Sequence, residues 1–333
     1  MTTITKEAAL EYHRANGVPG KISVTPTKPL ATQLDLGLAY TPGVAYPVLE
    51  LEKDPSLAYE YTDRGNLVAV VSNGTAIILG AAILNAMEIT HRDPKNTKVV
   101  FSGAGAAGIS CANQLLMLGF QKENLWLTDS KGVVYLGRQE NMSDQKASFA
   151  NGTRPATLAE VLEGADIFIG LSAANIVSQE MVKHMAAKPI IFPMANPDPE
   201  IKYDLAKAAR PDAIIGTGRS DFPNQINNVL GFPFIFRGAL DVRASTINDE
   251  MKLAASYALA KLAKEKVTTD VLKAYNLDHL EFGPDYVVPK PFDKRVCLYE
   301  APAVAKAAMD SGVAGKSVDL DQYVKQLEKR IFK

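Results

Sequence analysis

Between residues 98 and 216, short apolar runs alternate with longer stretches that mix apolar and polar positions. The apolar runs predict five strands, and most of the stretches between them predict helices. Strands that alternate with helices in this way favour the α/β class, with a parallel sheet covered on both faces. The predicted strands span residues 98–102, 124–128, 166–171, 189–194 and 213–216.

The regions on either side of this alternation have other patterns. Residues 1–13 predict an amphipathic helix, and the chain up to about Asn66 is then interrupted by turns such as Pro19-Gly20 and Pro42-Gly43. A short apolar run at 67–71 predicts a strand, and the apolar stretch 75–89 predicts a buried helix. Beyond Asn228 the pattern is mainly helical, with helices expected at 249–264, 301–309 and 319–331.

A glycine-rich turn separates the first of the five strands from a helical pattern. In a dinucleotide-binding loop, the first glycine permits a tight turn, the second lets the backbone approach the pyrophosphate, and the third lets helix and strand pack closely. The helix N-terminus then favours the bound anion. The loop predicts a site for NAD or NADP, the alternative being a turn that binds nothing. We assign to it Gly103, Gly105, Ala106, Ala107 and Gly108.

An acidic residue follows the loop at the expected distance. Asp129 ends the next predicted strand, about 20 residues beyond Gly108, where an acid that binds the adenosine ribose is expected. The alternative is that Asp129 only stabilises the turn before Lys131 and Gly132. Lys131 itself would attract a 2′-phosphate, so the choice between NAD and NADP stays open.

Composition and charge narrow the range of partners. The 333 residues carry 36 Lys+Arg against 37 Asp+Glu and no long basic run, so we expect neither nucleic acid nor a membrane surface as a partner. No apolar stretch approaches the ~20 residues that span a bilayer. With only Cys111 and Cys297, a disulfide framework is excluded, and we expect a cytoplasmic protein without a signal peptide.

Several further motifs resemble those of the short bacterial malic enzymes, and the resemblance covers nearly the whole chain. The motifs are PGKISV at 19–24, LAYTPGV at 38–44, GNLVAV at 65–70, ANPDPE at 195–200, GTGRSD at 216–221 and NQINNVLGFPF at 224–234. The last two are much more specific than the glycine loop.

This resemblance implies a reaction and several site residues. Malic enzymes oxidise L-malate with NAD or NADP and decarboxylate the bound product to pyruvate, using Mg or Mn, and a homodimer is expected. The resemblance places the tyrosine that protonates the enol at Tyr40, which by itself would also suit an aromatic anchor of the turn.

Two asparagines match the family's substrate and nicotinamide contacts. Asn196 and Asn228 carry amide groups, which donate to and accept from carboxylate, hydroxyl or carboxamide groups. Asn196 ends a predicted strand at the sheet edge where ligands of doubly wound folds bind. From the residues alone, Asn196 would equally suit a turn before Pro197, and Asn228 a helix cap before Val229.

The chain departs from the family after Ala76. A family member continues there with a second glycine-rich stretch, the lysine base, three metal carboxylates and another Gly-Thr-Ala, whereas here Ala76 runs directly into Ile77. The lysine and all three carboxylates therefore have no matching position, so no metal ligand is assigned. Lys21 and Lys28 match other family lysines, and surface roles are expected for Glu60, Asp63 and Glu88.

The expected architecture has two domains. Residues 1–76 form a truncated N-terminal α/β domain, and residues 77–333 form a Rossmann-type doubly wound parallel sheet followed by helices. Three hypotheses remain: a malic enzyme, a nucleotide-binding protein without turnover, and another Rossmann oxidoreductase such as an amino-acid dehydrogenase. The stretch 224–234 speaks against the third. Loss of the block after Ala76 is expected to expose apolar surface around 67–71 unless another chain covers it.

Overall fold

The computed structural model divides the chain into two compact units, residues 1–69 and 70–333. The division falls a few residues before the predicted boundary after Ala76. The residues that the structure describes are 5–14, 21, 27–29, 32–39, 43–68, 76–195, 198–219 and 222–331.

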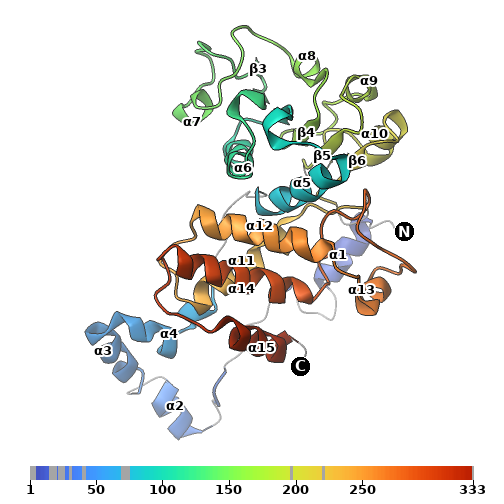
Figure 1. Ribbon diagram of the computed structural model, residues 1–333. Helices are drawn as coiled ribbons and strands as arrows, with labels where there is room; N and C mark the ends of the chain where they lie inside the picture. The colour runs from blue at the N-terminus through green and yellow to red at the C-terminus, as the bar shows by residue number, and fades with distance from the viewer. Residues whose placement is uncertain are drawn as a thin grey trace. The chain divides into compact units, whose positions relative to one another are not determined.

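The first unit consists of short helices wherever it is described. They are α1 (Lys6–Arg14), α2 (Gln33–Ala39), α3 (Ala45–Lys53) and α4 (Ala58–Tyr61), with single 3₁₀ turns at Pro55–Leu57 and Asp63–Gly65 (Figure 1). None of these elements buries a residue among those described. Leu67 and Val68, the described start of the predicted strand, are not in a strand and are 77% and 37% exposed, as the missing block leads one to expect.

The second unit is built on a six-stranded sheet in the order β3-β2-β1-β4-β5-β6. All five predicted strands are present. The short β3 was not predicted and pairs antiparallel with β2, whereas the other neighbours are parallel. The strands are β1 (Val99–Ser102), β2 (Leu125–Asp129), β3 (Gly132–Val133), β4 (Ile167–Gly170), β5 (Ile190–Pro193) and β6 (Ile214–Ile215).

Helices cover both faces of the sheet, which confirms the doubly wound prediction. Successive residues of one strand, such as Val100 and Phe101 of β1, belong to two different cores, because successive side chains of a strand point to opposite faces. The first core packs on α5 (Ala76–Thr90), α6 (Ala106–Met117) and α12 (Asp249–Ala263). The second packs on α8 (Leu158–Leu162), α9 (Gln179–Lys183) and α10 (Tyr203–Ala209).

The remainder of this unit is helical, as predicted for the chain beyond Asn228. The elements of this helical part are the 3₁₀ turn η6 (Asn228–Leu230), α11 (Phe232–Asp241), α13 (Thr269–Ala274), α14 (Arg295–Asp310) and α15 (Leu320–Ile331). Helix α14 packs against both α11 and α12, and Tyr323 and Leu327 are the buried residues of α15. Within the sheet region, the short elements η4 (Pro94–Asn96), η5 (Lys122–Asn124) and α7 (Asp144–Ala147) connect the main elements.

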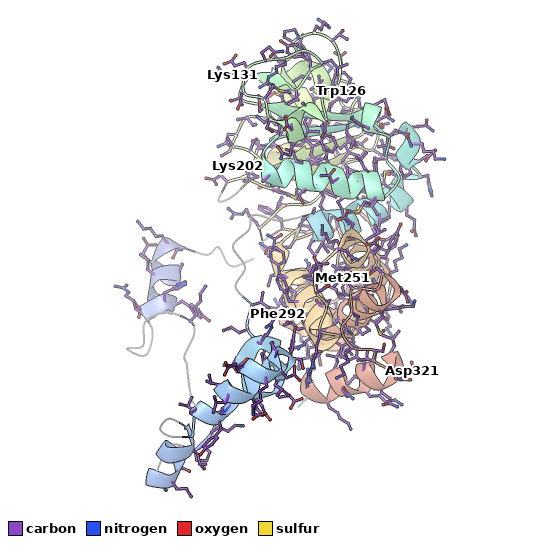
Figure 2. All side chains as sticks on the ribbon, turned by 90° about the vertical axis from the view of Figure 1, so that its left-hand side faces the viewer. Trp126, Lys131, Lys202, Met251, Phe292 and Asp321 are labelled. Atoms are coloured by element: carbon purple, nitrogen blue, oxygen red, sulfur yellow. The ribbon has the colours of Figure 1, made fainter. Side chains whose placement is uncertain are left out.

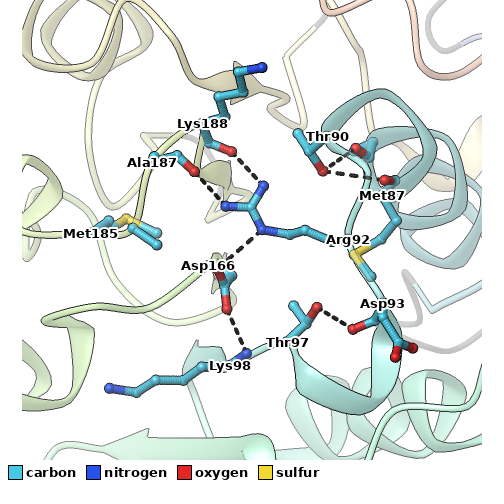
Figure 3. A network of polar contacts seen from close by, with 12 residues as sticks. Met87, Thr90, Arg92, Asp93, Thr97, Lys98, Asp166, Met185, Ala187 and Lys188 are labelled. Atoms are coloured by element: carbon cyan, nitrogen blue, oxygen red, sulfur yellow. Dashed lines mark hydrogen bonds and ion pairs between the residues drawn. The ribbon is translucent and has the colours of Figure 1, made fainter.

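A polar network braces the amino edge of the sheet (Figure 3). Arg92, which follows α5, contacts Asp166 at 3.1 Å and donates to the carbonyl oxygens of Ala187 and Lys188. Asp166 also accepts a hydrogen bond of 2.9 Å from the backbone N–H of Lys98. The half-buried guanidinium of Arg92 and the carboxylate of Asp166 therefore tie the starts of β1, β4 and β5 together.

Candidate functional site

The three glycines of the loop each meet a different steric demand. Gly103 has φ +116, and a Cβ there would lie 2.6 Å from the carbonyl oxygen of Leu171. A Cβ at Gly108 would lie 1.9 Å from the carbonyl oxygen of Gly103, so the third glycine allows the helix to pack on the turn. A Cβ at Gly105 would meet nothing within 4 Å. The open side of Gly105 fits a pyrophosphate that approaches the backbone.

A cavity of about 850 Å³ lies over this loop. Helix α6 begins at Ala106, and its N-cap Gly105 offers no side-chain cap, so the first-turn N–H groups face the cavity uncapped. These N–H groups and the helix dipole favour an anion. The other lining residues come from α6, from the stretch around α7 and from the start of α12, among them Ser110, Asn113, Lys146 and Lys252.

Asp129 ends β2, as predicted, but its carboxylate is already surrounded by donors. Arg138 contacts both oxygens at 2.7 and 2.8 Å, and Lys146 contacts Oδ2 at 2.8 Å. Asn141 and the backbone N–H of Lys131 donate at 3.0 and 2.9 Å. Burial acts to raise the pKa of Asp129, but these hydrogen bonds outweigh it and hold the pKa below its usual value. A carboxylate so saturated has little capacity left for a ribose hydroxyl.

The two cations beside Asp129 are placed differently from Lys131. The Arg138 and Lys146 side chains are 3% and 13% exposed, and Lys146 lines the cavity over the loop. The Lys131 side chain is 50% exposed, projects to the outside of this unit and pairs with Glu140 (Figure 2). Two cations against one acid leave this corner of the cavity positive.

Across the switch point of the sheet, a second acid joins the ends of β4 and β5. Oε1 of Glu200 accepts from the N–H of Ser172 at 2.8 Å, and Oε2 accepts from the N–H of Ala195 at 3.1 Å. The Ser172 hydroxyl lies 2.6 Å from that of Ser102, the last residue of β1. Burial raises the pKa of Glu200, and these N–H groups oppose the rise.

Asn228 lies in the turn η6 and lines a smaller cavity of about 210 Å³. Ser110 and Lys252 line both cavities, so the Asn228 pocket adjoins the space over the glycine loop. The capping role considered for Asn228 is wrong: the side chain that caps this turn is that of Asn227, which accepts from the N–H of Val229 at 3.1 Å. The amide of Asn228 makes no hydrogen bond with the described residues.

Two predicted site residues lie outside the described residues. Tyr40 directly follows α2, and Asn196 directly follows Ala195, whose N–H is held by Glu200. Their roles stay predictions.

The sequence did not predict the parts that Arg138, Lys146 and Glu200 play at this edge of the sheet. Only for Glu200 was there a signal, because it lies inside the ANPDPE motif at 195–200.

The described residues do not fit the family's metal. Across the residues that the structure describes, no three His, Cys, Asp or Glu side chains come together as a metal site requires. In the same part of the chain, no helix is long and apolar enough to cross a membrane. Both cysteines are free and buried.

Comparison with known proteins gives one consistent answer. The model of the NAD-binding domain of malic enzymes matches residues 72–275. The NADP-dependent malic enzyme of Halomonas elongata is 41% identical over 94% of this chain and 96% of its own length. The crystal structure of malic enzyme from Pyrococcus horikoshii superposes with a TM-score of 0.82 at 28% identity, over 98% of this chain and 96% of that chain.

A longer relative shows how much has no counterpart here. The NADP-dependent malic enzyme of Salmonella typhimurium is 45% identical over 98% of this chain, yet the chain spans only 56% of that relative. The alignment covers 422 positions, whereas the chain has 333 residues, so at least 89 of these positions (422 minus 333) have no residue in this chain. Residues of the relative are therefore missing within the matched region itself, and their place after Ala76 stays a prediction.

Proposed function

Because the chain belongs to the malic enzyme family, we propose that it oxidises L-malate with NADP and releases pyruvate and CO₂. The observation that carries this proposal is the glycine loop, in which Gly103 and Gly108 have no room for a side chain and Gly105 faces an open cavity. Those three conditions are the ones a bound dinucleotide imposes.

The chemistry assigned to this chain's own residues is binding and proton transfer. NADP, when bound, would accept the hydride from C2 of malate, and the proton of the C2 hydroxyl would pass to water, because the family's lysine base has no matching position here. The first turn of α6 holds the pyrophosphate, and Asn196 and Asn228 orient the substrate and the nicotinamide amide. Tyr40 delivers a proton to the enol carbon that CO₂ leaves behind. No step is assigned to Mg or Mn, because the described residues provide no ligand set for either ion.

The corner around Asp129 supports NADP over NAD. The carboxylate is saturated, so it is poorly suited to accept from a free 2′-hydroxyl, whereas Lys146 lies at the cavity wall. A 2′-phosphate would accept charge-assisted hydrogen bonds from such a cation. We therefore propose that Asp129 holds Lys146 and Arg138 in place for the phosphate rather than contacting the ribose itself.

A second candidate function is NADP binding without turnover. Two observations favour this second candidate. The chain lacks residues that the Salmonella relative has within the aligned region, and the described residues hold no cluster of metal ligands. Such a protein would keep the complete cofactor cavity and lack the groups that activate malate.

Malate-dependent formation of NADPH separates the two candidates. The intact mass of the purified protein first establishes that the expressed chain has 333 residues. Turnover with malate and Mn above that of a Tyr40→Phe control supports the malic enzyme. NADPH binding by fluorescence titration, with no turnover above that control, supports the second candidate and rejects the first for this chain.

We also propose that a second copy of the chain covers the first unit. The described helices of this unit bury no residue. Its exposed side chains include Tyr46, Val48, Leu49 and Leu67, each at least 49% exposed. An apolar surface of this kind is typical of an interface. Light scattering is expected to give a dimer. With two free buried cysteines, we expect this dimer in the cytoplasm.

A further inference from the structure

Glu200 is a fully buried acid at the carboxyl edge of the sheet, with 0% of its surface exposed. Its side chain occupies the space beside the last residue of β4: a Cβ at Gly170 would lie 2.3 Å from the carboxyl carbon of Glu200. The backbone around it is tied down as well, because the N–H of Val177 donates to the carbonyl oxygen of Glu200 at 3.0 Å. The strand therefore ends in glycine at the point where the carboxylate must fit.

Each donor to this carboxylate among the described residues is an uncharged group. They are the N–H groups of Ser172 and Ala195 and the Ser172 hydroxyl, which lies 3.4 Å from Oε1. Among the described residues, no lysine, arginine or histidine forms an ion pair with Glu200. Hydrogen bonds from neutral groups spread a negative charge but do not cancel it. Asp129, with two cations in contact, is the opposite case.

The position of Glu200 relative to the cofactor follows from the strand order. In a doubly wound sheet, a dinucleotide crosses the carboxyl edge at the point where the strand order reverses, here between β1 and β4. The corner for the adenosine ribose is at the end of β2. The nicotinamide half therefore belongs on the β4–β5 side, where Glu200 joins the ends of those two strands.

We infer that Glu200 is a positioning residue whose uncompensated negative charge selects the oxidised cofactor, in addition to holding the backbone that leads to Asn196. This inference rests on the proposed cofactor site. The oxidised nicotinamide ring carries a positive charge, which is lost when the ring accepts a hydride. A buried carboxylate near the ring therefore attracts the oxidised form and leaves the reduced form unaffected, and the attraction is strong because the low dielectric screens it little.

Binding of the two redox forms to the full chain tests this inference without relying on turnover. Dissociation constants for NADP⁺ and NADPH are measured by calorimetric titration for the unaltered protein and for Glu200→Gln. We expect Glu200→Gln to weaken NADP⁺ binding by about tenfold and NADPH binding by less than about twofold. Equal weakening of both forms would mean that Glu200 only supports the loop, and the inference would be overturned.

Two variants separate charge from shape. Glu200→Asp keeps the charge while shortening the side chain, so both affinities fall together and their ratio stays within about twofold of the unaltered protein. Glu180→Gln removes a 68%-exposed acid from α9 and is expected to leave both constants unchanged. A changed ratio in Glu180→Gln would show that any acid in this half has the effect, which contradicts a specific role for Glu200.

Failure of the inference is distinguishable from failure of the proposed function. If the unaltered protein binds neither NADP⁺ nor NADPH, the cofactor site itself is rejected, and with it the role of Glu200. If the unaltered protein binds both forms and Glu200→Gln leaves their ratio unchanged, the site stands and only the charge selection falls.

Discussion

Each half of the sheet's carboxyl edge holds a buried carboxylate, but the two carboxylates have different kinds of partner. At the end of β2, Asp129 contacts Arg138 and Lys146, so two positive charges meet one negative charge. At the ends of β4 and β5, Glu200 meets only N–H and hydroxyl groups. The first half therefore suits an anion and the second suits a cation. An oxidised NADP molecule has that polarity, with a phosphate at one end and a charged ring at the other.

The largest expected effect comes from breaking the cationic half. Arg138→Met removes a buried partner of Asp129 and also the donors to the carbonyl oxygens of Val133 and Glu140. Asp129 then keeps only Lys146 of its two cations and loses two charge-assisted hydrogen bonds in a buried place, so we expect the free energy of unfolding to fall by about 3 kcal/mol in urea denaturation. Arg154→Met, at an exposed position, is the control. Equal losses in the two variants would contradict the assignment.

Lys146→Ser tests which cation reads the 2′-phosphate. We expect the preference for NADPH over NADH, measured as the ratio of dissociation constants, to fall by about 10- to 100-fold, because a charge-assisted hydrogen bond is lost. Lys131→Ser is the matched control, since that side chain pairs with Glu140 outside the cavity. If Lys131→Ser lowers the preference and Lys146→Ser does not, the phosphate binds on the outer side of the turn.

Glu300 provides a third buried acid, in α14. Neither of its carboxyl oxygens has a hydrogen-bond partner among the described residues, and burial raises its pKa well above 4.5. The folded state therefore holds a proton that the unfolded chain releases, so stability is lost as pH rises above 4.5. We expect Glu300→Met to stabilise the protein by about 1–3 kcal/mol near neutral pH.

The pH dependence of this gain is the check. The difference in unfolding free energy between Glu300→Met and the unaltered protein should be larger at about pH 8 than at about pH 5. Glu328→Met, at an exposed position of α15, should show no such gain. A pH-independent difference would mean that packing, and not the buried carboxyl group, causes the change.

The smallest expected effect is at the ends of β1 and β4, where neutral hydrogen-bond donors surround Glu200. Ser102→Ala removes the hydroxyl that links β1 to Ser172 at 2.6 Å, and we expect a loss of about 1 kcal/mol in the free energy of unfolding. Ser148→Ala, whose exposed hydroxyl bonds only to the carbonyl oxygen of Gln145, should cost less. A loss as large as that of Arg138→Met would show that the two halves are not held by different means.

Features with a local cause were predictable from the sequence. The five main strands and the glycine loop depend on neighbouring residues, and both are present. The strand β3 was missed because a two-residue antiparallel pair leaves no hydrophobic period to detect. The cap of η6 is Asn227 rather than Asn228, an error of one residue between identical side chains.

The electrostatic part of the site depends on contacts across the chain and could not be predicted. Asp129 was identified by its position after β2, but nothing in the sequence indicates that Arg138 and Lys146 fold back onto it. Glu200 reaches Ser172 across two strand ends. Which donors meet a carboxylate decides whether it binds ribose, orients a cation or keeps its charge, so residue type and spacing alone leave these roles open.

The Arg92 network makes the amino edge of the sheet independent of the residues before α5. It secures the amino edge of the sheet with residues that all lie between positions 92 and 188, beyond the join at Ala76. Mechanical support and ligand recognition thus lie at opposite edges of one sheet. A chain that loses residues at the start of α5 would keep this support, so the cofactor half can be retained when the other half of the cleft changes.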